Sequence, residues 1–258
     1  MWRPVYTLTV REFQRFVRQR SRILGALGTP LVFWLLIGSG LGRSFTSNVT
    51  GPEGNFLEYF FPGTFTLVIL FTAIFSAISL IEDRHEGFLQ GVLVAPAPRW
   101  AIALGKILGS TVLATGQAVL FLVLAPLAGL PLSWAQIPAV VLATVLLAFA
   151  LGGLGFAVAW KIDSVQGFHS IMNLLLIPMW ILSGALFPAD GASRWMAVLL
   201  TFNPLTYGVA AVRHALYSPG ALAAGALPSW PLSLAVTAAF GALCFGASIL
   251  LLVRPRTS

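Results

Sequence analysis

Few side chains in this 258-residue chain have the types and spacing that catalysis or metal binding requires. The three histidines, His85, His169 and His214, stand far apart, with no second histidine at the short spacing of a metal site. Cys244 is the only cysteine and cannot form an internal disulfide. Phosphate-loop, zinc-protease and nucleophile-elbow motifs are missing from the sequence. This pattern disfavours an enzyme, including a lipid transferase, which needs polar groups gathered at one membrane depth.

The composition indicates that the elements carrying these residues lie in lipid. Hydrophobic residues make up 58% of the chain, charged residues 9%, and the mean hydropathy is +0.90. Six apolar runs are long enough to cross a hydrocarbon core of ~30 Å as helices, which satisfy their own backbone hydrogen bonds. We predict an all-α membrane protein, a single domain over residues 1–258, with transmembrane helices at 23–42, 60–81, 102–129, 135–160, 168–188 and 232–253.

The acidic residues all fall in loops or at the ends of these predicted spans. They are Glu12, Glu53, Glu58, Glu82, Asp83, Glu86, Asp163 and Asp190. A proton- or sodium-driven carrier, or a selective cation channel, would need carboxylates within the spans, where they are costly and usually functional. We therefore expect that any active transport draws its energy from a partner.

The basic residues predict the orientation of the chain. Arg43, Arg194 and Arg213 fall on one side of the predicted spans, and the other twelve of the 15 Lys and Arg residues fall on the opposite side, with both termini. Basic residues concentrate in the cytoplasm, so both termini are predicted to be cytoplasmic. The net charge of +7 then indicates contact with anionic lipid and not with nucleic acid.

The amino-terminal segment, residues 1–22, is predicted to form an interfacial helix. From residue 4 onward its arginines alternate with bulky apolar residues, which could face the acyl chains while the arginines meet phosphates. These apolar residues are Val5, Leu8, Phe13, Phe16 and Val17. A solvated basic tail is the alternative.

The connection between the second and third spans has a different character from the other loops. Residues 82–101 read EDRHEGFLQGVLVAPAPRWA, with charges first, an apolar turn next and two prolines that end it. We predict a short helix within 82–100 on the cytoplasmic face. Its charges would set the register, and its apolar residues would anchor a cytoplasmic protein.

Small residues in the third predicted span indicate close packing of helices. Gly105, Gly109 and Gly116 are predicted to permit close helix contacts.

The segment between the fifth and sixth spans is irregular. Its apolar pieces are too short and too interrupted for two more spans. We predict a re-entrant helical segment at 189–217, enclosed by protein or a water-filled cavity. A pair of surface helices is the alternative.

Three stretches of the sequence resemble a known family. Residues 61–109 (beginning FPGTFTLVIL), residues 175–188 (LLIPMWILSGALFP) and residues 203–216 (NPLTYGVAAVRHAL) are similar to parts of the membrane subunit of type-2 ABC exporters. In order, these parts are the second span with its coupling helix, the fifth span and the re-entrant segment. The family includes drug-resistance, lipo-oligosaccharide and polysaccharide export proteins, and the six-span layout extends the resemblance over the whole chain.

The resemblance implies a permease of the bacterial inner membrane that is not itself an enzyme. Two copies would pair with two cytoplasmic ATPase subunits, which would bind ATP and Mg²⁺, while this chain would bind no cofactor. The residues that the resemblance assigns to ATPase coupling are Glu82, Asp83, Arg84, Glu86, Gly87, Phe88, Leu89, Leu93, Pro96, Arg99, Arg11 and Arg15.

The resemblance also implies a translocation path lined by the first, second and fifth spans. Candidate lining residues are Phe33, Trp34, Phe65, Phe71, Phe75, Met179 and Trp180, with Asn203, Pro204 and Tyr207 near the outer exit. Each aromatic residue could instead pack in the core or face lipid. The apolar lining favours an amphipathic substrate, such as a drug, a lipid or a lipid-linked glycan. A membrane scaffold that recruits a cytoplasmic partner without transport is the alternative function.

Overall fold

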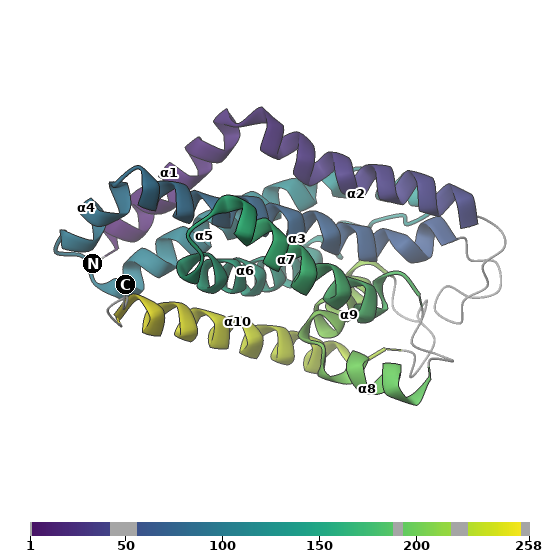
Figure 1. Ribbon diagram of the computed structural model, residues 1–258. Helices are drawn as coiled ribbons and strands as arrows, with labels where there is room; N and C mark the ends of the chain where they lie inside the picture. Colours follow the sequence, from purple (N-terminus) through teal and green to yellow (C-terminus); the bar gives the residue numbers. More distant parts are fainter. Residues whose placement is uncertain (1, 42–55, 188–192, 218–226, 254–258) are drawn as a thin grey trace.

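The computed structural model describes residues 2–41, 56–187, 193–217 and 227–253 (Figure 1). Arg43, Glu53 and Asp190, which the sequence places in loops, lie outside these ranges. All regular structure within them is helical. The elements are α1 (Arg3–Arg18), α2 (Arg20–Leu41), α3 (Phe56–His85), α4 (Phe88–Val94), α5 (Arg99–Leu122), η2 (Ala125–Ala128), α6 (Ile137–Lys161), α7 (Val165–Trp180), η3 (Ile181–Ala185), α8 (Arg194–Phe202), α9 (Pro204–Leu216) and α10 (Trp230–Val253).

The six predicted spans are confirmed among the described residues. They are α2, α3, α5, α6, α7 with η3, and α10, each long and apolar enough to cross a membrane. The predicted third span, 102–129, is divided, because α5 ends at Leu122 and the short 3-10 helix η2 follows. With six crossings, the start of α1, helix α4 and the end of α10 lie at one end of the bundle, here called the α4 end (Figure 1).

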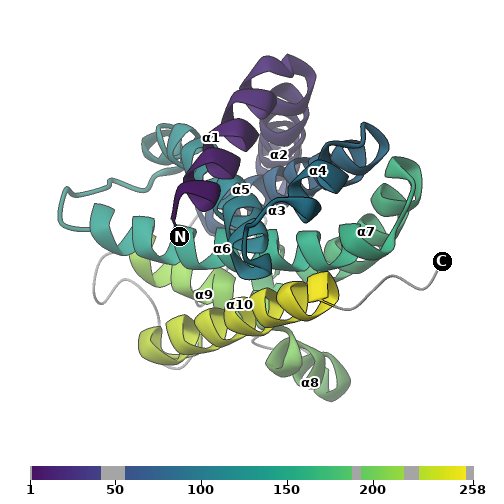
Figure 2. The same ribbon diagram turned by 90° about the vertical axis from the view of Figure 1, so that its left-hand side faces the viewer.

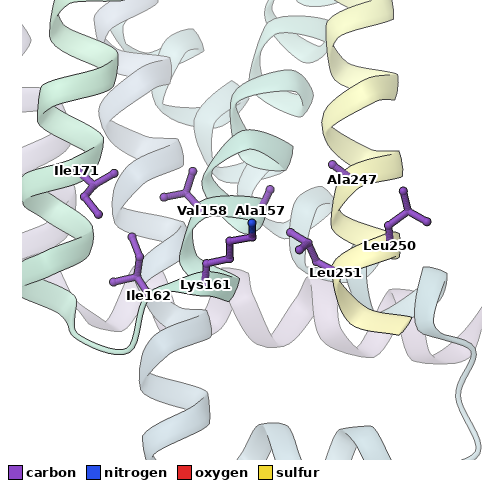
Figure 3. Close-up of a pocket in the computed structure, with 8 residues that line it drawn as sticks. All are labelled: Ala157, Val158, Lys161, Ile162, Ile171, Ala247, Leu250 and Leu251. Carbon is purple, nitrogen blue, oxygen red and sulfur yellow. The ribbon is translucent and has the colours of Figure 1, made fainter. Parts of the chain in front are cut away.

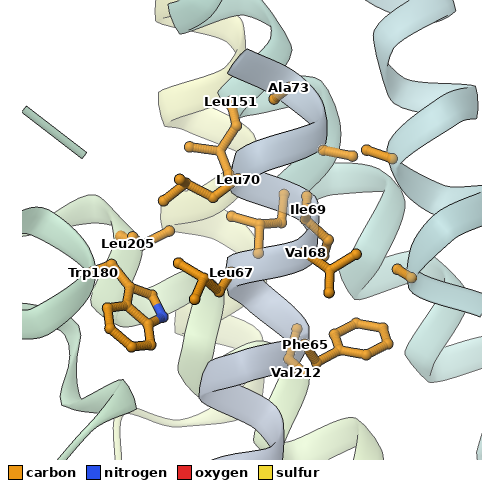
Figure 4. Packing of buried hydrophobic residues seen from close by; sticks show 14 of the residues in the cluster. Phe65, Leu67, Val68, Ile69, Leu70, Ala73, Leu151, Trp180, Leu205 and Val212 are labelled. Atoms are coloured by element: carbon orange, nitrogen blue, oxygen red, sulfur yellow. The ribbon is translucent and has the colours of Figure 1, made fainter. Parts of the chain in front are cut away.

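Helix α3 forms the centre of the bundle. It packs against α2, α5, α6 and α7 and also contacts α9. From residue 59 to residue 81, every residue except Phe71 and Phe75 is buried. Figure 4 shows side chains of α3 packed with Leu151 of α6, Trp180 of α7 and two residues of α9. Outer helices α2, α7 and α10 leave large apolar side chains exposed, as expected for surfaces that meet lipid or another apolar partner.

Helix α1 is amphipathic as predicted, but three of its five predicted apolar residues pack on protein. Val5, Leu8 and Phe16 are buried, and α1 lies along α5 (Figure 2). Phe13 and Val17 stay exposed. The helix is also shorter than the predicted 1–22, since it ends at Arg18 and non-helical Gln19 separates it from α2.

Glycines of α5 explain why α1 comes so close. A Cβ atom at Gly109 would lie 2.6 Å from the Cβ of Glu12, and one at Gly105 would lie 2.8 Å from the Cβ of Leu8. These two glycines therefore have the packing role predicted for them. Gly116 does not, because nothing lies within 4 Å of a Cβ atom there.

The segment after α7 folds as the bent helix pair α8 and α9, with an angle of 80° between them. Helix α9 lies inside the bundle against α6, α10 and α3, so the alternative of two surface helices is wrong for α9. Helix α8 lies at the surface, with Trp195 and Phe202 exposed. Arg213, which the sequence places on the outer side within the predicted re-entrant segment, is buried within α9, because the segment folds back into the bundle.

Candidate functional site

Residues 82–100, which were predicted to dock a cytoplasmic protein and are here called the docking segment, contain a short helix, α4, between two sharp turns. Gly87 has a φ of +76°, which side-chain-bearing residues rarely adopt, and it redirects the chain from α3 into α4. Ala95 and Pro98 are extended and lead into α5. The helix is therefore narrower than the predicted 82–100: the residues from Glu82 to His85 belong to α3, and Arg99 begins α5.

Helix α4 uses most of its apolar residues to pack on its own chain. Leu89 is buried, and Phe88 and Leu93 are half-buried. The predicted anchors therefore hold α4 against the bundle, where their apolar area is removed from water. The outward surface is formed instead by residues 90–91 and by Val94, whose exposed fraction is 86%. Pro96, in the following turn, is also exposed.

A buried group of charges joins α1, α3 and α5; we call it the ion cluster, and it consists of Arg11, Glu12, Arg15, Asp83 and Lys106. Asp83 is fully buried and accepts hydrogen bonds from Arg11 at 2.8 and 2.7 Å, and from Arg15 and Lys106. The buried Lys106 also donates to Glu12. Each buried charge thus faces an opposite charge, which offsets the cost of removing it from water.

The ion cluster continues outward towards the surface of the α4 end. Arg15 donates to Glu82 at 3.0 Å and to Glu86 at 2.8 Å. Arg22 of α2 also forms an ion pair with Glu82. The carboxylates of the docking segment therefore bind arginines of the same chain, and α2 joins the network.

Arg11 is held by an aromatic ring as well as by the carboxylate of Asp83. Its guanidinium carbon lies 3.6 Å from the centre of the Phe88 ring, so Arg11 also links the ion cluster to α4. Burial acts to lower the pKa of Arg11, but the hydrogen bond and charge of Asp83 raise it, and the net result is a pKa above the ordinary arginine value. Arg11 is therefore a permanent cation in this cluster.

Arg84 caps the end of α6. It donates to the carbonyl oxygens of Ile162 at 2.9 Å, Trp160 at 2.9 Å and Ala159 at 3.2 Å, and it pairs with Asp163 at 3.0 Å. A cation at a helix carboxyl terminus complements the helix dipole and the carbonyl groups that the helix leaves without partners. The end of α3 is thus tied to α6 as well as to α1, α2 and α5.

A second irregular site lies where α7 breaks into the π-helical turn η3. Leu182 has non-helical backbone angles and Gly184 has a φ of +76°. Asn203, between α8 and α9, donates to the carbonyl oxygens of Met179 at 2.6 Å and Leu182 at 2.9 Å, and its own oxygen accepts from the Leu205 N–H at 3.0 Å. One side chain thus satisfies carbonyls at the break and caps α9.

Arg213 holds the same break from within the bundle. It is 1% exposed and donates to the carbonyl oxygens of Gly184 at 2.9 Å and Tyr59 at 3.3 Å. Its guanidinium carbon lies 4.0 Å from the centre of the Tyr59 ring. Carbonyl groups and an aromatic face replace the water that this charge loses on burial.

A comparison with family models matches residues 3–217, from α1 through α9, to the model described as ABC-2 type transporter. The chain belongs to the ABC-2 type transporter family. Its six apolar spans agree with a membrane component of a transporter, so this ABC-2 chain is a permease-family protein.

Relatives of this ABC-2 chain are similar over most of its length. A protein named transport permease ycf38, from Cyanophora paradoxa, is 25% identical over 216 residues, 83% of this chain and 74% of that protein. Nodulation protein J of Rhizobium leguminosarum bv. viciae is 27% identical over 204 residues, 75% of this chain and 74% of that protein. Inner membrane transport permease YhhJ of Escherichia coli (strain K12) is 25% identical over 177 residues, 68% of this chain and 46% of YhhJ.

The predicted path residues of this ABC-2 chain divide into buried and accessible ones. Trp34 and Trp180 are buried and donate to the carbonyl oxygens of residues 57 and 63, and Phe65 is fully buried, so these three pack in the core. Phe33 is exposed on α2. The others are half-buried except for the buried Asn203: Phe71, Phe75, Met179, Pro204 and Tyr207.

Several residues of both sites were missed by the sequence analysis, which assigned no site role to Glu12, Arg22, Lys106 or Arg213. Lys106 falls within the predicted third span, 102–129, and a cation there is a signal of a buried partner. No comparable signal identifies Glu12, because its hydrogen-bond partners lie 67 and 94 positions away.

Proposed function

We propose that this chain is the permease subunit of an ATP-driven exporter. Two copies form the path for an amphipathic substrate, such as a drug, a lipid or a lipid-linked glycan. Two cytoplasmic ATPase subunits, which bind the ATP and Mg²⁺, dock at the α4 end. The protein lies in the bacterial inner membrane with both termini in the cytoplasm, in accord with the distribution of its basic residues.

The connection of α4 to the transmembrane helices is the observation that carries this proposal. The outward side of α4, with Val94 and Gln90, is open to a partner. Its inner side is joined through Arg11 and the ion cluster to α1, α3 and α5, and the adjoining Arg84 is joined to α6. A force applied to α4 therefore reaches the spans through ion pairs and hydrogen bonds.

The accessible part of α3 supports a path between two copies. Phe71 and Phe75 are four residues apart on one face of α3, and their rings stack at 6.2 Å. Phe75 lies between α2 and α7: a Cβ atom at Gly25 of α2 would lie 3.4 Å from its ring, and the ring of His169 of α7 lies 5.8 Å away. A second copy placed against α2 and α7 would enclose this pair.

Transport requires that the complex has two states and that ATP binds one of them more tightly than the other. ATP binding draws the two ATPase subunits together and moves α4 with the helices joined to it. The spans beside Phe71 and Phe75 separate or close in response. The break between α7 and α9, held by Asn203 and Arg213, lies away from the α4 end and acts at the outer exit.

Purification of the tagged full-length protein from its native membrane in mild detergent tests the proposal. We expect an ATP-binding subunit to co-purify in stoichiometric amount, with vanadate-sensitive ATP hydrolysis. Val94→Glu should abolish this association, because it places a charge on the outward side of α4. Trp134→Glu is the matched control, since Trp134 is equally exposed but follows α5 at the opposite end of the bundle.

The outcomes separate the competing functions. Loss of the ATPase in Val94→Glu and its retention in Trp134→Glu would support docking at α4. Co-purification of a different cytoplasmic protein, with no ATP hydrolysis, would favour the scaffold function. Equal retention of the ATPase by both variants would place the docking surface away from α4.

A further inference from the structure

A groove opens on the surface of the bundle where α6, α7 and α10 diverge (Figure 3). Its cavity volume is about 550 Å³, within the range of roughly 300–1,000 Å³ that is usual for small-molecule sites. The lining residues are Ala157, Val158, Lys161, Ile162, Ile171, Ala247, Leu250 and Leu251. Seven of them are apolar, so the groove offers a hydrocarbon surface to whatever occupies it.

Lys161 supplies the one positive charge of this lining. It is the last residue of α6 and is exposed at the α4 end. Figure 3 shows its side chain between Ile171 of α7 and the α10 residues, with the nitrogen turned over the groove. The groove therefore has a cation at its mouth and apolar walls that continue into the depth of the spans.

Among the described residues, two neighbouring groups also affect the electrostatics of the mouth. Asp163 is exposed, but it pairs with Arg84 at 3.0 Å, which offsets its negative charge. Helix α7 begins at Val165, so its amino terminus adds a partial positive potential beside Lys161. Lys161 and the amino terminus of α7 thus both favour an anionic group at the mouth.

We propose that this groove binds one anionic phospholipid from the leaflet at the α4 end. The phosphate group pairs with Lys161, and an acyl chain lies against α6 and α10. A basic residue at a pocket between transmembrane helices attracts anionic head groups, and the chain gains free energy by covering apolar surface. The lipid is a bound ligand and not the transported molecule, so the inference holds whether or not the chain exports a substrate.

Native mass spectrometry of the purified full-length protein, titrated with phosphatidylglycerol or phosphatidylcholine, tests this site. We expect one phosphatidylglycerol to be retained in preference to phosphatidylcholine. Lys161→Gln should weaken phosphatidylglycerol binding roughly five-fold, the equivalent of about 1 kcal/mol, and leave phosphatidylcholine unchanged. Lys161→Arg should keep the preference, and Ala247→Phe should fill the groove and weaken both lipids.

Two matched variants control for general effects of charge and bulk. Arg20→Gln removes another exposed cation at the α4 end, and Ala242→Phe adds the same ring to an exposed position of α10 outside the groove. Both should bind phosphatidylglycerol as the wild type does. Wild-type binding by Lys161→Gln and Ala247→Phe would overturn the proposal, as would an equal loss in Arg20→Gln. A loss of dimers in Ala247→Phe with lipid retained would overturn it in favour of a second copy as the occupant.

Discussion

Arg11 and Asp83, 72 positions apart in the sequence, form a two-point ion pair at 2.8 and 2.7 Å that joins the amino-terminal helix to the central helix of the bundle. Arg11 also covers the ring of Phe88 in α4. The pair therefore lies between the helix proposed to receive the ATPase and the spans proposed to move.

Replacing Asp83 should cost far more stability than replacing a carboxylate at the surface. Asp83→Asn removes the negative charge shared by Arg11, Arg15 and Lys106 and replaces one of the two acceptor oxygens with an NH₂ donor. Loss of one partner from a buried charge group costs about 3–5 kcal/mol. Glu86→Gln, at a carboxylate that is 57% exposed, should cost about 0–1 kcal/mol. Thermal unfolding in detergent measures both, and equal midpoints for the two variants would contradict a stabilising role for the cluster.

Replacing a glycine of α5 by alanine should displace α1 at Gly109 but not at Gly116. Gly109→Ala puts a Cβ atom 2.6 Å from the Cβ of Glu12, and such overpacking costs about 1–3 kcal/mol. Gly116→Ala meets nothing within 4 Å and should stabilise the helix by up to about 1 kcal/mol. Unfolding midpoints and protease sensitivity of α1 report the difference. Similar behaviour of the two variants would mean that α1 does not pack on α5 in the membrane.

Reversing the charge of Glu82 should reduce transport because it breaks the pair with Arg22. Glu82→Arg should uncouple ATP hydrolysis from transport, and the double variant Glu82→Arg with Arg22→Glu should restore much of the coupling. The assay is the ratio of substrate moved to ATP hydrolysed in proteoliposomes. If the double variant stays uncoupled while the ATPase still binds, the pair of Glu82 with Arg22 is not sufficient for coupling, and the pair of Glu82 with Arg15 is also required.

Replacing Asn203 should impair transport while leaving assembly with the ATPase intact. Asn203→Ala removes the cap of α9, worth about 1 kcal/mol, and takes the side-chain donor from the carbonyl oxygens of Met179 and Leu182, at a cost of about 1–3 kcal/mol. Asn203→Asp keeps the cap but removes both donors, so it separates the two roles. Normal transport by both variants would show that the break between α7 and α9 has no part in the cycle.

The accessible aromatic pair of α3, Phe71 and Phe75, should contribute to substrate binding. Phe75→Ala should weaken binding of an amphipathic substrate by roughly three- to ten-fold, the scale of one aromatic contact. Phe149→Ala is the matched control, since Phe149 is a partly buried ring that packs against Phe245 on the α10 side. Substrate-stimulated ATP hydrolysis gives the apparent affinity. An equal effect of both changes would indicate a general loss of packing.

The apolar runs alone determined the class of the protein and its six spans, because a backbone in lipid must form its hydrogen bonds within each helix. Local sequence also predicted a short helix within residues 82–100 that ends before Pro96 and Pro98, and an irregular helical segment at 189–217. Proline interrupts a helix at its own position, and the length of an apolar run is a local property, so these features can be predicted without the rest of the fold.

The tertiary structure alone decided which faces of these helices are covered. Helix α3 is apolar on every side, so no periodicity in its sequence distinguishes buried Phe65 from accessible Phe71 and Phe75. The apolar face of α1 could equally have met lipid, and the glycines of α5 directed it onto protein instead. The partners of Asp83 come from two other helices, because the free energy of a buried charge depends on groups that the fold brings together and not on its neighbours in the chain.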